Sequence, residues 1–214
     1  MKRLLLGIAS WIAAFALSTT AMAADLQAGK HYTVINPPLQ STTPGKIEVV
    51  EFFSYGCIHC SNFHPLISAW SAKKPADVSF RRVHVTFNRP PLARLAKAFY
   101  AGEAIGIAHK LDDEIFRAIH EQRVNFSSDE DLLKFVGSRG FDAKKFGDAM
   151  NGFSMQSQVT RGDQEAVAAK INGTPAIVVD GRYLINNDAT RNLAELMALT
   201  DDVIALARKD KSKK

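Results

Sequence analysis

Cysteine is nearly absent from this chain, since Cys57 and Cys60 are its only cysteines in 214 residues. Small exported domains that depend on disulfide bonds for stability carry many more cysteines than this. A disulfide between residues only three positions apart closes a very small loop, so it removes little entropy from the unfolded chain. The pair is therefore poorly placed to crosslink the fold, and we interpret it as a site of chemistry.

Other absences exclude several functional classes. The sequence has no glycine-rich loop of the kind that holds phosphates, no internal repeat and no low-complexity domain. Its net charge is only +5, and much of the surplus lies in residues 207–214, which we expect to form a frayed, solvated end. The basic residues form no face with interleaved aromatic residues, so we expect no binding to nucleic acid.

The first 23 residues have the pattern of a secretory signal peptide. Lys2 and Arg3 precede an uncharged, mostly apolar run over 4–17, and Ala21 and Ala23 occupy the small-residue positions of a cleavage site. The apolar run is shorter than the roughly 20 residues of a membrane-spanning helix. No second run of that length follows. We therefore predict cleavage after Ala23, with export of a mature chain of 191 residues.

The order of predicted elements indicates an α/β core that is interrupted by helices. Runs rich in β-branched and aromatic residues predict strands at 32–35, 47–53 and 78–87. Helical patterns without a convincing strand follow, at about 92–104, 108–121, 128–137, 142–150 and 154–170. Ser127 with Glu130 predicts a capping box in this block. Asp180 and Gly181 predict a β-hairpin turn, and 189–207 predicts a final amphipathic helix.

The cysteine pair lies where a strand and a tight turn are followed by a predicted helix over 58–71. Pro65 falls inside that helix and is expected to kink it. His64 is expected on the helix surface. The spacing of five apolar residues gives this helix an apolar stripe, formed by Ile58, Phe63, Leu66, Ile67 and Trp70.

Placement at the start of a helix makes Cys57 the more reactive cysteine. Free backbone N–H groups and the positive end of the helix dipole then face its sulfur, and His59 can add a positive charge close by. These effects favour the thiolate, so we expect the pKa of Cys57 to fall well below that of free cysteine. Cys60 lies one turn further in, with less access to amides and solvent. We therefore predict that Cys57 forms the mixed disulfides with substrates and that Cys60 is the buried resolving thiol.

The same physical chemistry predicts the direction of electron flow. A stabilised Cys57 thiolate favours the reduced pair over the disulfide, and it is a good leaving group in exchange with substrate thiols. Both effects make the protein an oxidant of other thiols.

Three segments carry a resemblance to a known family. They are VVEFFSYGCIHCSNFHP (49–65), RRVHVTFN (81–88) and INGTPAIVVDGRY (171–183). They resemble the DsbA family of thiol:disulfide interchange proteins of bacterial periplasms, within the thioredoxin-like superfamily. The resemblance spans essentially the whole mature chain. It implies an α/β thioredoxin-like fold with an inserted all-helical domain, in which 24–89 and 157–214 form the core and 90–156 form the insertion.

The resemblance also implies roles for individual residues. Cys57 is similar to the family's nucleophile and Cys60 to its partner, and together they would form the redox-active disulfide. His59 resembles the histidine that stabilises the thiolate. Glu51, six residues before Cys57, resembles a buried acid that helps to move the Cys60 proton, and its place in an apolar run favours burial. Arg82 falls where a basic neighbour of that acid is expected.

A second set of family positions concerns the substrate. Pro175 resembles the cis-proline opposite the disulfide, and Thr174 would then present its backbone to a bound substrate strand. Ile58 stands where the family most often has proline, and Thr174 replaces the valine of its best-known members. Both departures affect redox potential and substrate release, so the resemblance supports an oxidant more firmly than an especially strong one.

The sequence therefore favours a monomeric periplasmic enzyme that donates its disulfide to unfolded exported proteins containing cysteines. The resemblance implies a DsbB-type membrane quinone reductase as the reoxidant, and no metal, flavin or nucleotide cofactor is required. A thioredoxin-like reductase or isomerase is the alternative among enzymes, although about 33 residues before Cys57 leave no room for a dimerisation domain. Two non-enzymatic alternatives are a metallochaperone that binds through Cys57, Cys60 and His64, and a holdase-like binding module.

Overall fold

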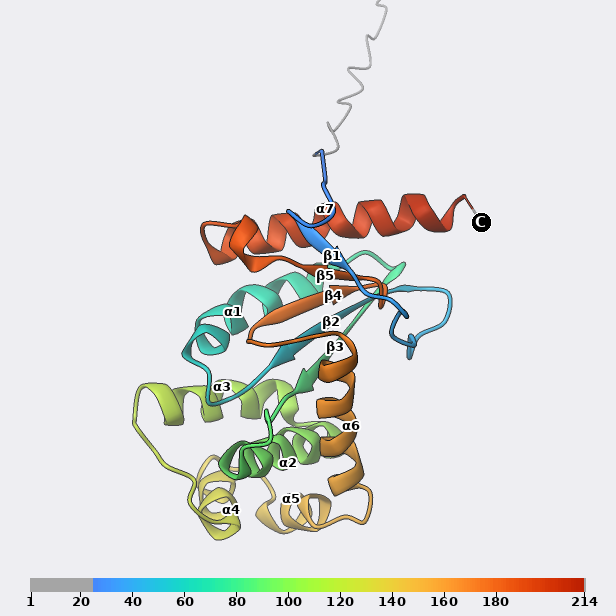
Figure 1. Ribbon diagram of the computed structural model, residues 1–214. Helices are drawn as coiled ribbons and strands as arrows, with labels where there is room; N and C mark the ends of the chain where they lie inside the picture. Colours follow the sequence, from blue (N-terminus) through green and yellow to red (C-terminus); the bar gives the residue numbers. More distant parts are fainter. Residues whose placement is uncertain (1–24, 214) are drawn as a thin grey trace, which may run out of the picture.

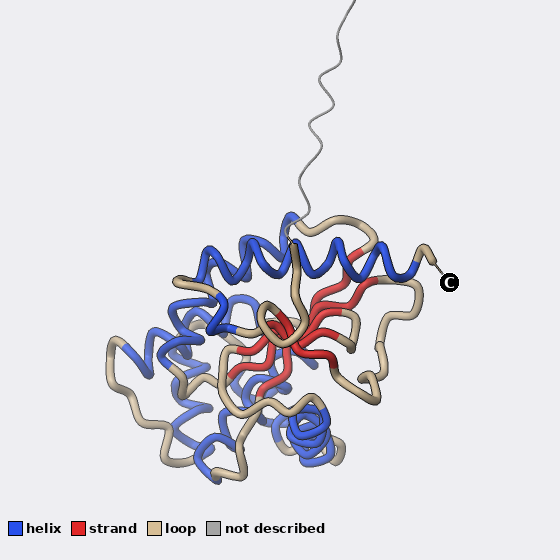
Figure 2. The backbone as a smooth tube through the Cα atoms, turned by 45° about the horizontal axis from the view of Figure 1, so that its top comes forward, coloured by secondary structure: helices blue, strands red, loops and turns tan. Residues whose placement is uncertain are grey.

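Residues 25–213 are described by the computed structural model, in which a five-stranded sheet is covered by helices on both faces (Figures 1 and 2). The predicted signal peptide, residues 1–23, lies outside these described residues. Within residues 25–213, no helix is both long enough and apolar enough to cross a membrane.

The sheet is mixed, and its central strand leads directly to the cysteine pair. Its order is β1-β5-β4-β2-β3, with β2 parallel to β3 and antiparallel to β4. All seven residues of β2 are buried, which explains its nearly unbroken apolar run. The strands are β1 (Tyr32–Val34), β2 (Ile47–Phe53), β3 (Val78–His84), β4 (Ala176–Val179) and β5 (Tyr183–Ile185).

Seven α-helices and one short 3-10 helix, η1, complete the described residues. Their bounds are α1 (Ile58–Lys73), α2 (Pro90–Ile105), α3 (Ala108–His120), α4 (Asp129–Ser138), α5 (Ala143–Met150), α6 (Met155–Ala168), η1 (Asn187–Ala189) and α7 (Leu193–Lys211). Each predicted helical segment is therefore present, within a few residues of its expected ends. Helix α1 also continues through Pro65 without interruption.

Three hydrophobic clusters hold these layers together. Side chains of α1 and α7 pack on one face of the sheet, where Phe63 and Val203 join Val49 in a single cluster. Residues of α6 cover part of the other face, where Ala166 packs near Val50. The helices α2 to α5 form their own core, which also includes Phe53 and Cys60. Figure 1 shows this helical part at one end of the sheet, on the side away from α7.

This architecture confirms the α/β fold with an inserted helical block. The chain leaves the sheet after β3, forms α2 to α6, and returns as the β4–β5 hairpin. Asp180 and Gly181 both have positive φ in the hairpin turn, as a tight two-residue connection requires. The domain limits 24–89, 90–156 and 157–214 stay a prediction.

Three local predictions were wrong. The capping box is formed by Ser128 and Asp131, one residue later than expected, and a short aspartate side chain completes it. Strand β3 ends at His84, because Phe87 and Asn88 have positive φ values that end the extended conformation.

The third wrong prediction concerns the basic C-terminal segment. Helix α7 continues to Lys211, so most of this segment is ordered helix and not a frayed end. The ammonium group of Lys211 contacts both a carboxylate oxygen of Asp180 and the carbonyl oxygen of Lys46, each at 2.7 Å. These contacts attach the last helical turn to two loops at the end of the sheet.

Candidate active site around Cys57 and Cys60

A tight turn after β2 brings Cys57 to the start of α1. The backbone N–H of Cys57 donates to the carbonyl oxygen of Ser54 at 3.1 Å and closes the turn. Cys57 is the N-cap residue and has extended backbone angles, so free N–H groups of the first helical turn face its sulfur. Gly56 has little room for a side chain, because a Cβ atom there would lie 2.9 Å from Cδ2 of Leu92 on α2.

The surroundings of Cys57 favour its thiolate. Its pKa is lowered from 9.0 to about 5, chiefly by a hydrogen bond from the Cys60 thiol. Partial burial opposes this shift, while the side chain of Thr174 and the backbone N–H groups of Cys60 and His59 add to it. The side chain of His59 is exposed to solvent. Cys57 itself is partly exposed and can be reached by another thiol.

Cys60 has the opposite environment. It is fully buried, with no exposed surface, and it belongs to the core that α1 shares with the helical insertion. Burial raises the pKa of its thiol far above the ordinary value, and the neighbouring Cys57 raises it further. Both residues are free thiols here. Cys57 is therefore partly exposed with a lowered pKa, whereas Cys60 is buried with a raised one.

The loop before β4 places Thr174 and Pro175 opposite the cysteines. The peptide bond between these two residues is cis, as the family resemblance implies. The Cys57 thiol donates to the carbonyl oxygen of Thr174 at 3.2 Å. On the other side of the loop, Nδ2 of Asn187 donates to the carbonyl oxygen of Pro175 at 2.8 Å. A cleft of about 880 Å³ continues from Thr174 toward the β4–β5 hairpin and Asn186.

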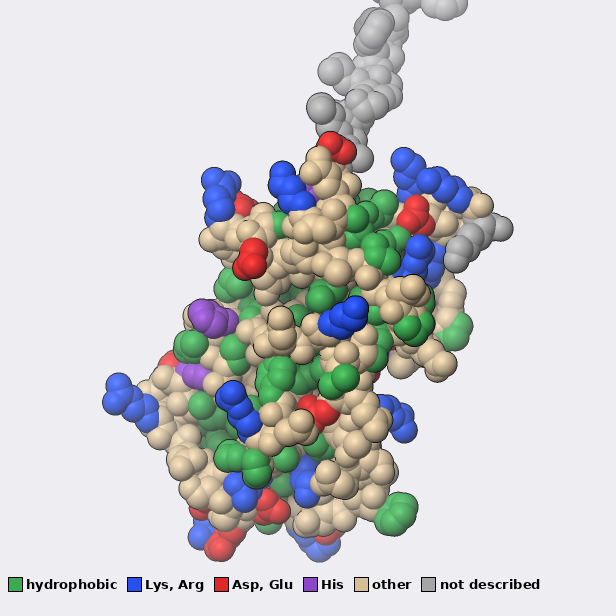
Figure 3. All heavy atoms as spheres, viewed as in Figure 1, with side chains coloured by type: hydrophobic (Ala, Val, Ile, Leu, Met, Phe, Trp, Pro, Cys, Tyr) green, Lys and Arg blue, Asp and Glu red, His purple; other side chains and the backbone are tan. Residues whose placement is uncertain are grey.

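Helix α1 carries two exposed apolar residues, of which one directly follows Cys57. Ile58 is 48% exposed and Leu66 is 41% exposed. Phe63 and Ile67 are buried. Figure 3 shows hydrophobic side chains gathered across the middle of one face, while charged groups lie mostly toward its two ends.

His64 takes one of the buried positions on α1, so its predicted surface location was also wrong. It is 6% exposed and its ring packs against Phe116 of α3. Its Nε2 lies 3.0 Å from a carboxylate oxygen of Asp113, and its Nδ1 lies 3.4 Å from the hydroxyl of Ser68. Among residues 25–213, no group of three or more His, Cys, Asp or Glu side chains is arranged to hold a metal ion.

Glu51 lies at the centre of the sheet, on the face that α1 covers. It is fully buried and stands opposite Arg82 in the parallel register of β2 and β3. Nε of Arg82 donates to Oε2 of Glu51 at 2.8 Å. Burial raises the pKa of the Glu51 carboxyl, and the Arg82 charge lowers it only in part. Both the predicted burial of Glu51 and its basic neighbour are therefore present.

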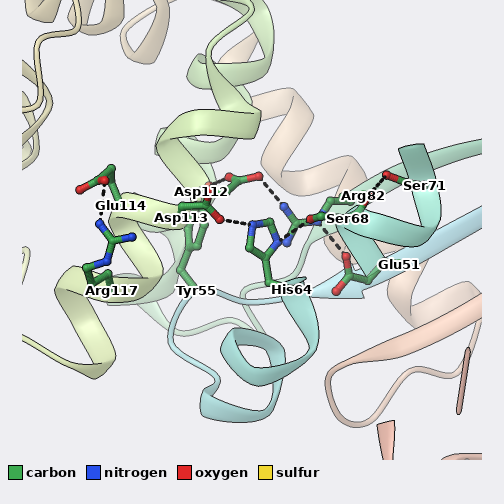
Figure 4. A network of polar contacts seen from close by, with 10 residues as sticks. All are labelled: Glu51, Tyr55, His64, Ser68, Ser71, Arg82, Asp112, Asp113, Glu114 and Arg117. Carbon is green, nitrogen blue, oxygen red and sulfur yellow. Dashed lines mark hydrogen bonds and ion pairs between the residues drawn. The ribbon is translucent and has the colours of Figure 1, made fainter. Parts of the chain in front are cut away.

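The structure adds two residues to this cluster that the sequence did not predict (Figure 4). Nη1 of Arg82 donates to Oδ2 of Asp112 at 2.5 Å, and the Tyr55 hydroxyl donates to the other oxygen of Asp112. Tyr55 lies in the turn before Cys57 and is fully buried, and Asp112 lies on α3 and is 3% exposed. The guanidinium of Arg82 also lies 3.7 Å from the ring centre of Phe53. The helical insertion therefore contacts the cysteine turn directly, and it is linked to the buried acid through Arg82.

Two histidines hold the backbone of the same turn. The N–H of Tyr55 donates to Nε2 of His84 at 3.1 Å, and Nε2 of His120 donates to the carbonyl oxygen of Tyr55 at 2.8 Å. Burial and the nearby Arg82 lower the pKa of His84 to about 3, so its ring is neutral. The common partner of these two histidines could be recognised only after β3 and α3 had been placed around the turn.

The fold and these contacts define a dithiol–disulfide oxidoreductase of the thioredoxin-like class, with a reactive cysteine at a helix N-terminus and a cis-proline loop opposite it. The chain belongs to the family described as the DSBA-like thioredoxin domain, whose model matches residues 48–198.

Related proteins support this assignment. The chain is 37% identical over 202 residues to the thiol:disulfide interchange protein DsbA of Bordetella parapertussis, covering 92% of this chain and 96% of that protein. It is 35% identical over 188 residues to DsbA of Pseudomonas aeruginosa, covering 88% and 89%.

Solved structures lead to the same family. The crystal structure of Pseudomonas aeruginosa DsbA matches with a TM-score of 0.83 at 34% identity, over 89% of this chain and 98% of that one. The Xylella fastidiosa DsbA structure matches with a TM-score of 0.78 at 28% identity, over 86% and 98%. The protein is thus a protein thiol–disulfide oxidoreductase that introduces disulfide bonds.

Proposed function

We propose that the mature protein works in the periplasm, where the Cys57–Cys60 disulfide is transferred to newly exported proteins. The observation that supports these roles most directly is the contrast between the two thiols. The pKa of Cys57 is lowered to about 5, whereas that of buried Cys60 is raised. A low-pKa thiolate leaves readily and stabilises the reduced enzyme, which favours transfer of the disulfide to a substrate.

The reaction takes two exchange steps. A substrate thiolate attacks the sulfur of Cys57 and forms a mixed disulfide, while the electron pair of the broken S–S bond passes to Cys60. Because Cys60 is buried, its thiolate is costly and takes up a proton, for which we assign Glu51 as the donor. A second substrate thiolate then attacks the substrate sulfur of the mixed disulfide, and Cys57 leaves as a thiolate. The substrate has lost two electrons and the enzyme has gained them.

We assign substrate binding to the surface around this pair. Thr174 presents its backbone beside Cys57, and Pro175 fixes the loop from which an extended substrate segment is recognised. Ile58 is exposed next to the reactive sulfur and offers an apolar contact to unfolded chains. The backbone N–H of His59 lowers the pKa of Cys57. None of these contacts needs a particular substrate sequence.

The remaining assignments concern location and partners. We propose that residues 1–23 are removed on export, that the mature enzyme is a monomer, and that a DsbB-type membrane quinone reductase returns it to the disulfide form. Cell fractionation with N-terminal sequencing tests the first point, and sedimentation tests the second. Reoxidation by membranes that contain such a reductase, compared with membranes that lack it, tests the third.

Trapping of the mixed disulfide tests the residue roles. A reduced, unfolded cysteine protein is mixed with oxidised enzyme and analysed without reductant. The wild-type enzyme should oxidise this substrate. Cys60→Ser, first activated as a mixed disulfide with glutathione, should exchange onto the substrate and stay attached to it. Cys57→Ser, treated in the same way, should form little adduct. Equal adducts with both variants would contradict the assignment of Cys57 as the nucleophile.

A further inference from the structure

Two buried carboxyl groups share one guanidinium below the cysteine turn. Nε of Arg82 donates to Glu51 at 2.8 Å, and Nη1 donates to Asp112 at 2.5 Å. Glu51 has no exposed surface and Asp112 is 3% exposed. The three groups come from β2, β3 and α3, and Figure 4 shows Arg82 lying between the two carboxyl groups. The attraction of one cation is therefore divided between two acids.

The two acids accept different numbers of hydrogen bonds. Asp112 accepts from Arg82 through one oxygen and from the Tyr55 hydroxyl through the other. Glu51 accepts from Arg82 through Oε2, and its buried Oε1 has no partner among residues 25–213. Two carboxyl groups and one guanidinium cannot all be charged at low cost in a buried site. The proton is retained most easily on the acid with fewer donors, which is Glu51.

We propose that Asp112 is a positioning residue of the redox site, which acts through Arg82 to keep Glu51 able to hold the proton that Cys60 needs. The inference rests on the proposed role of Glu51 as proton donor. In the first exchange step the broken S–S bond gives its electron pair to Cys60, the Glu51 proton moves to that sulfur, and the Glu51 carboxylate remains. Asp112 makes this transfer possible at higher pH, because its charge offsets that of Arg82.

Other titratable groups surround the cluster. A pocket of about 490 Å³ between α1, β3, α2 and α3 is lined by Arg82 and Asp112 together with His64, Glu103, His109 and Asp113. Burial and the Asp112 charge raise the pKa of Glu103, and burial and Arg82 lower the pKa of His64. Asp113 contacts His64 and is 60% exposed at its side chain. Asp112 is the acid that contacts Arg82 directly, whereas Asp113 offers a control of equal charge.

The first experiment measures the proton on Glu51 by infrared spectroscopy of the oxidised protein. The carbonyl band of the protonated carboxyl group is followed against pH and assigned by its loss in Glu51→Gln. In Asp112→Asn we expect the titration midpoint to fall by about one unit, which is a tenfold loss of proton affinity. In Asp113→Asn, which removes the same charge from the next residue, the midpoint should stay in place. An unchanged midpoint in Asp112→Asn would overturn the proposal.

The second experiment measures the rate of disulfide reduction by a small dithiol at a series of pH values. The Asp112→Asn rate is divided by the wild-type rate at each pH. This division cancels the pH dependence that comes from ionisation of the dithiol, because it is the same for both proteins. We expect this ratio to be near one below both Glu51 midpoints, to fall across them, and to stay at about one tenth above them, which is the tenfold loss of proton affinity. If the Asp112→Asn rate is lower than the wild-type rate by the same factor at every pH, and the Glu51 midpoint does not move, Asp112 has a structural role only.

A third variant keeps the test decisive if Asp112→Asn folds poorly. Tyr55→Phe removes one of the two donors of Asp112, so that Asp112 and Glu51 each keep one and the proton is held less exclusively by Glu51. The Glu51 midpoint should then fall, and a rise or an unchanged midpoint would contradict the proposal. If the midpoints move as expected and the rate ratio stays flat, Asp112 controls Glu51 but Glu51 is not the proton donor. That result would reject the proposed role of Glu51 and leave the coupling intact.

Discussion

Cys57 and Thr174 are separated by 117 residues in the chain, yet the sulfur of one lies 3.2 Å from the carbonyl oxygen of the other. The contact joins the two parts of the sheet that flank the inserted helices, because Cys57 follows β2 and Thr174 precedes β4. The site is therefore complete only when both parts of the core have paired.

The low pKa of Cys57 should depend on Cys60 more than on Thr174. The Cys60 thiol is the largest cause of the lowered pKa and the Thr174 side chain is a smaller one. We expect Cys60→Ala to raise the Cys57 pKa substantially toward 9.0, and Thr174→Val to raise it less. Thiolate absorbance against pH measures both shifts, with Cys60→Ser as a control that retains a hydroxyl donor. A larger shift in Thr174→Val than in Cys60→Ala would reverse this order of causes.

The stability of the reduced protein should rise with pH across the range in which only the folded state is ionised. The pKa of Cys57 is about 5 when folded and near 9.0 when unfolded, so the unfolded state binds more protons between these values. The stabilisation is lost as the pH falls through about 5. Above about 9 it stops growing, and the raised pKa of Cys60 then opposes it.

Denaturation of the reduced and oxidised forms measures this linkage. The oxidised form has no Cys57 thiol to titrate, so it provides the reference at each pH. We expect the difference in unfolding free energy to shift steadily in favour of the reduced form from pH 4 to pH 8. A difference that is constant across this range would show that the thiolate is not stabilised by the fold.

Burial and turns could be predicted from the sequence where they depend on residues close together in the chain. The turn and helix around Cys57 are local, so the exposed position of Cys57 and the burial of Cys60 could both be predicted. Glu51 was predicted to be buried because apolar residues surround it on both sides in the chain. The Asp180–Gly181 hairpin could be predicted for the same reason, since its turn needs only those two residues.

Predictions failed where packing between segments distant in the sequence determines whether a side chain is buried. His64 lies on the buried side of α1 because α3 packs there. The roles of Asp112 and His120 depend on α3 reaching the cysteine turn, a contact between segments more than 50 residues apart. An acid in an amphipathic helix normally faces solvent, so neither Asp112 nor Asp113 was given a role, although the spacing from Ile115 and Phe116 places Asp112 on the apolar face of α3.

Removal of the Tyr55 hydroxyl should destabilise the protein. In Tyr55→Phe one oxygen of buried Asp112 loses its donor, and a buried acceptor without a partner costs about 1–3 kcal/mol. Tyr183→Phe is the matched control, because its hydroxyl donates at 2.6 Å to Asp210, which lies near the surface. We expect the control to lose much less stability in urea denaturation. Equal losses in the two variants would contradict the importance of the buried Asp112 contact.

The exposed apolar residues of α1 should matter for unfolded substrates and not for small thiols. We expect Ile58→Ser and Leu66→Ser to lower kcat/KM severalfold for a reduced, unfolded protein, while the rate with glutathione changes little. Val34→Ser on β1 removes a similarly exposed side chain, 52% accessible, and should affect neither rate. If both α1 variants oxidise the unfolded protein at the wild-type rate, this surface does not bind substrates.

The redox equilibrium with glutathione tests the central claim most directly, namely that the Cys57 thiolate makes this protein a disulfide donor. The purified protein is equilibrated in buffers with increasing ratios of oxidised to reduced glutathione, and the fraction of free thiol is measured after acid quenching. We expect the pair to remain largely a dithiol until oxidised glutathione is in large excess, because the folded reduced form is stabilised. A disulfide that persists in an excess of reduced glutathione would contradict the claim and would identify the protein as a reductant.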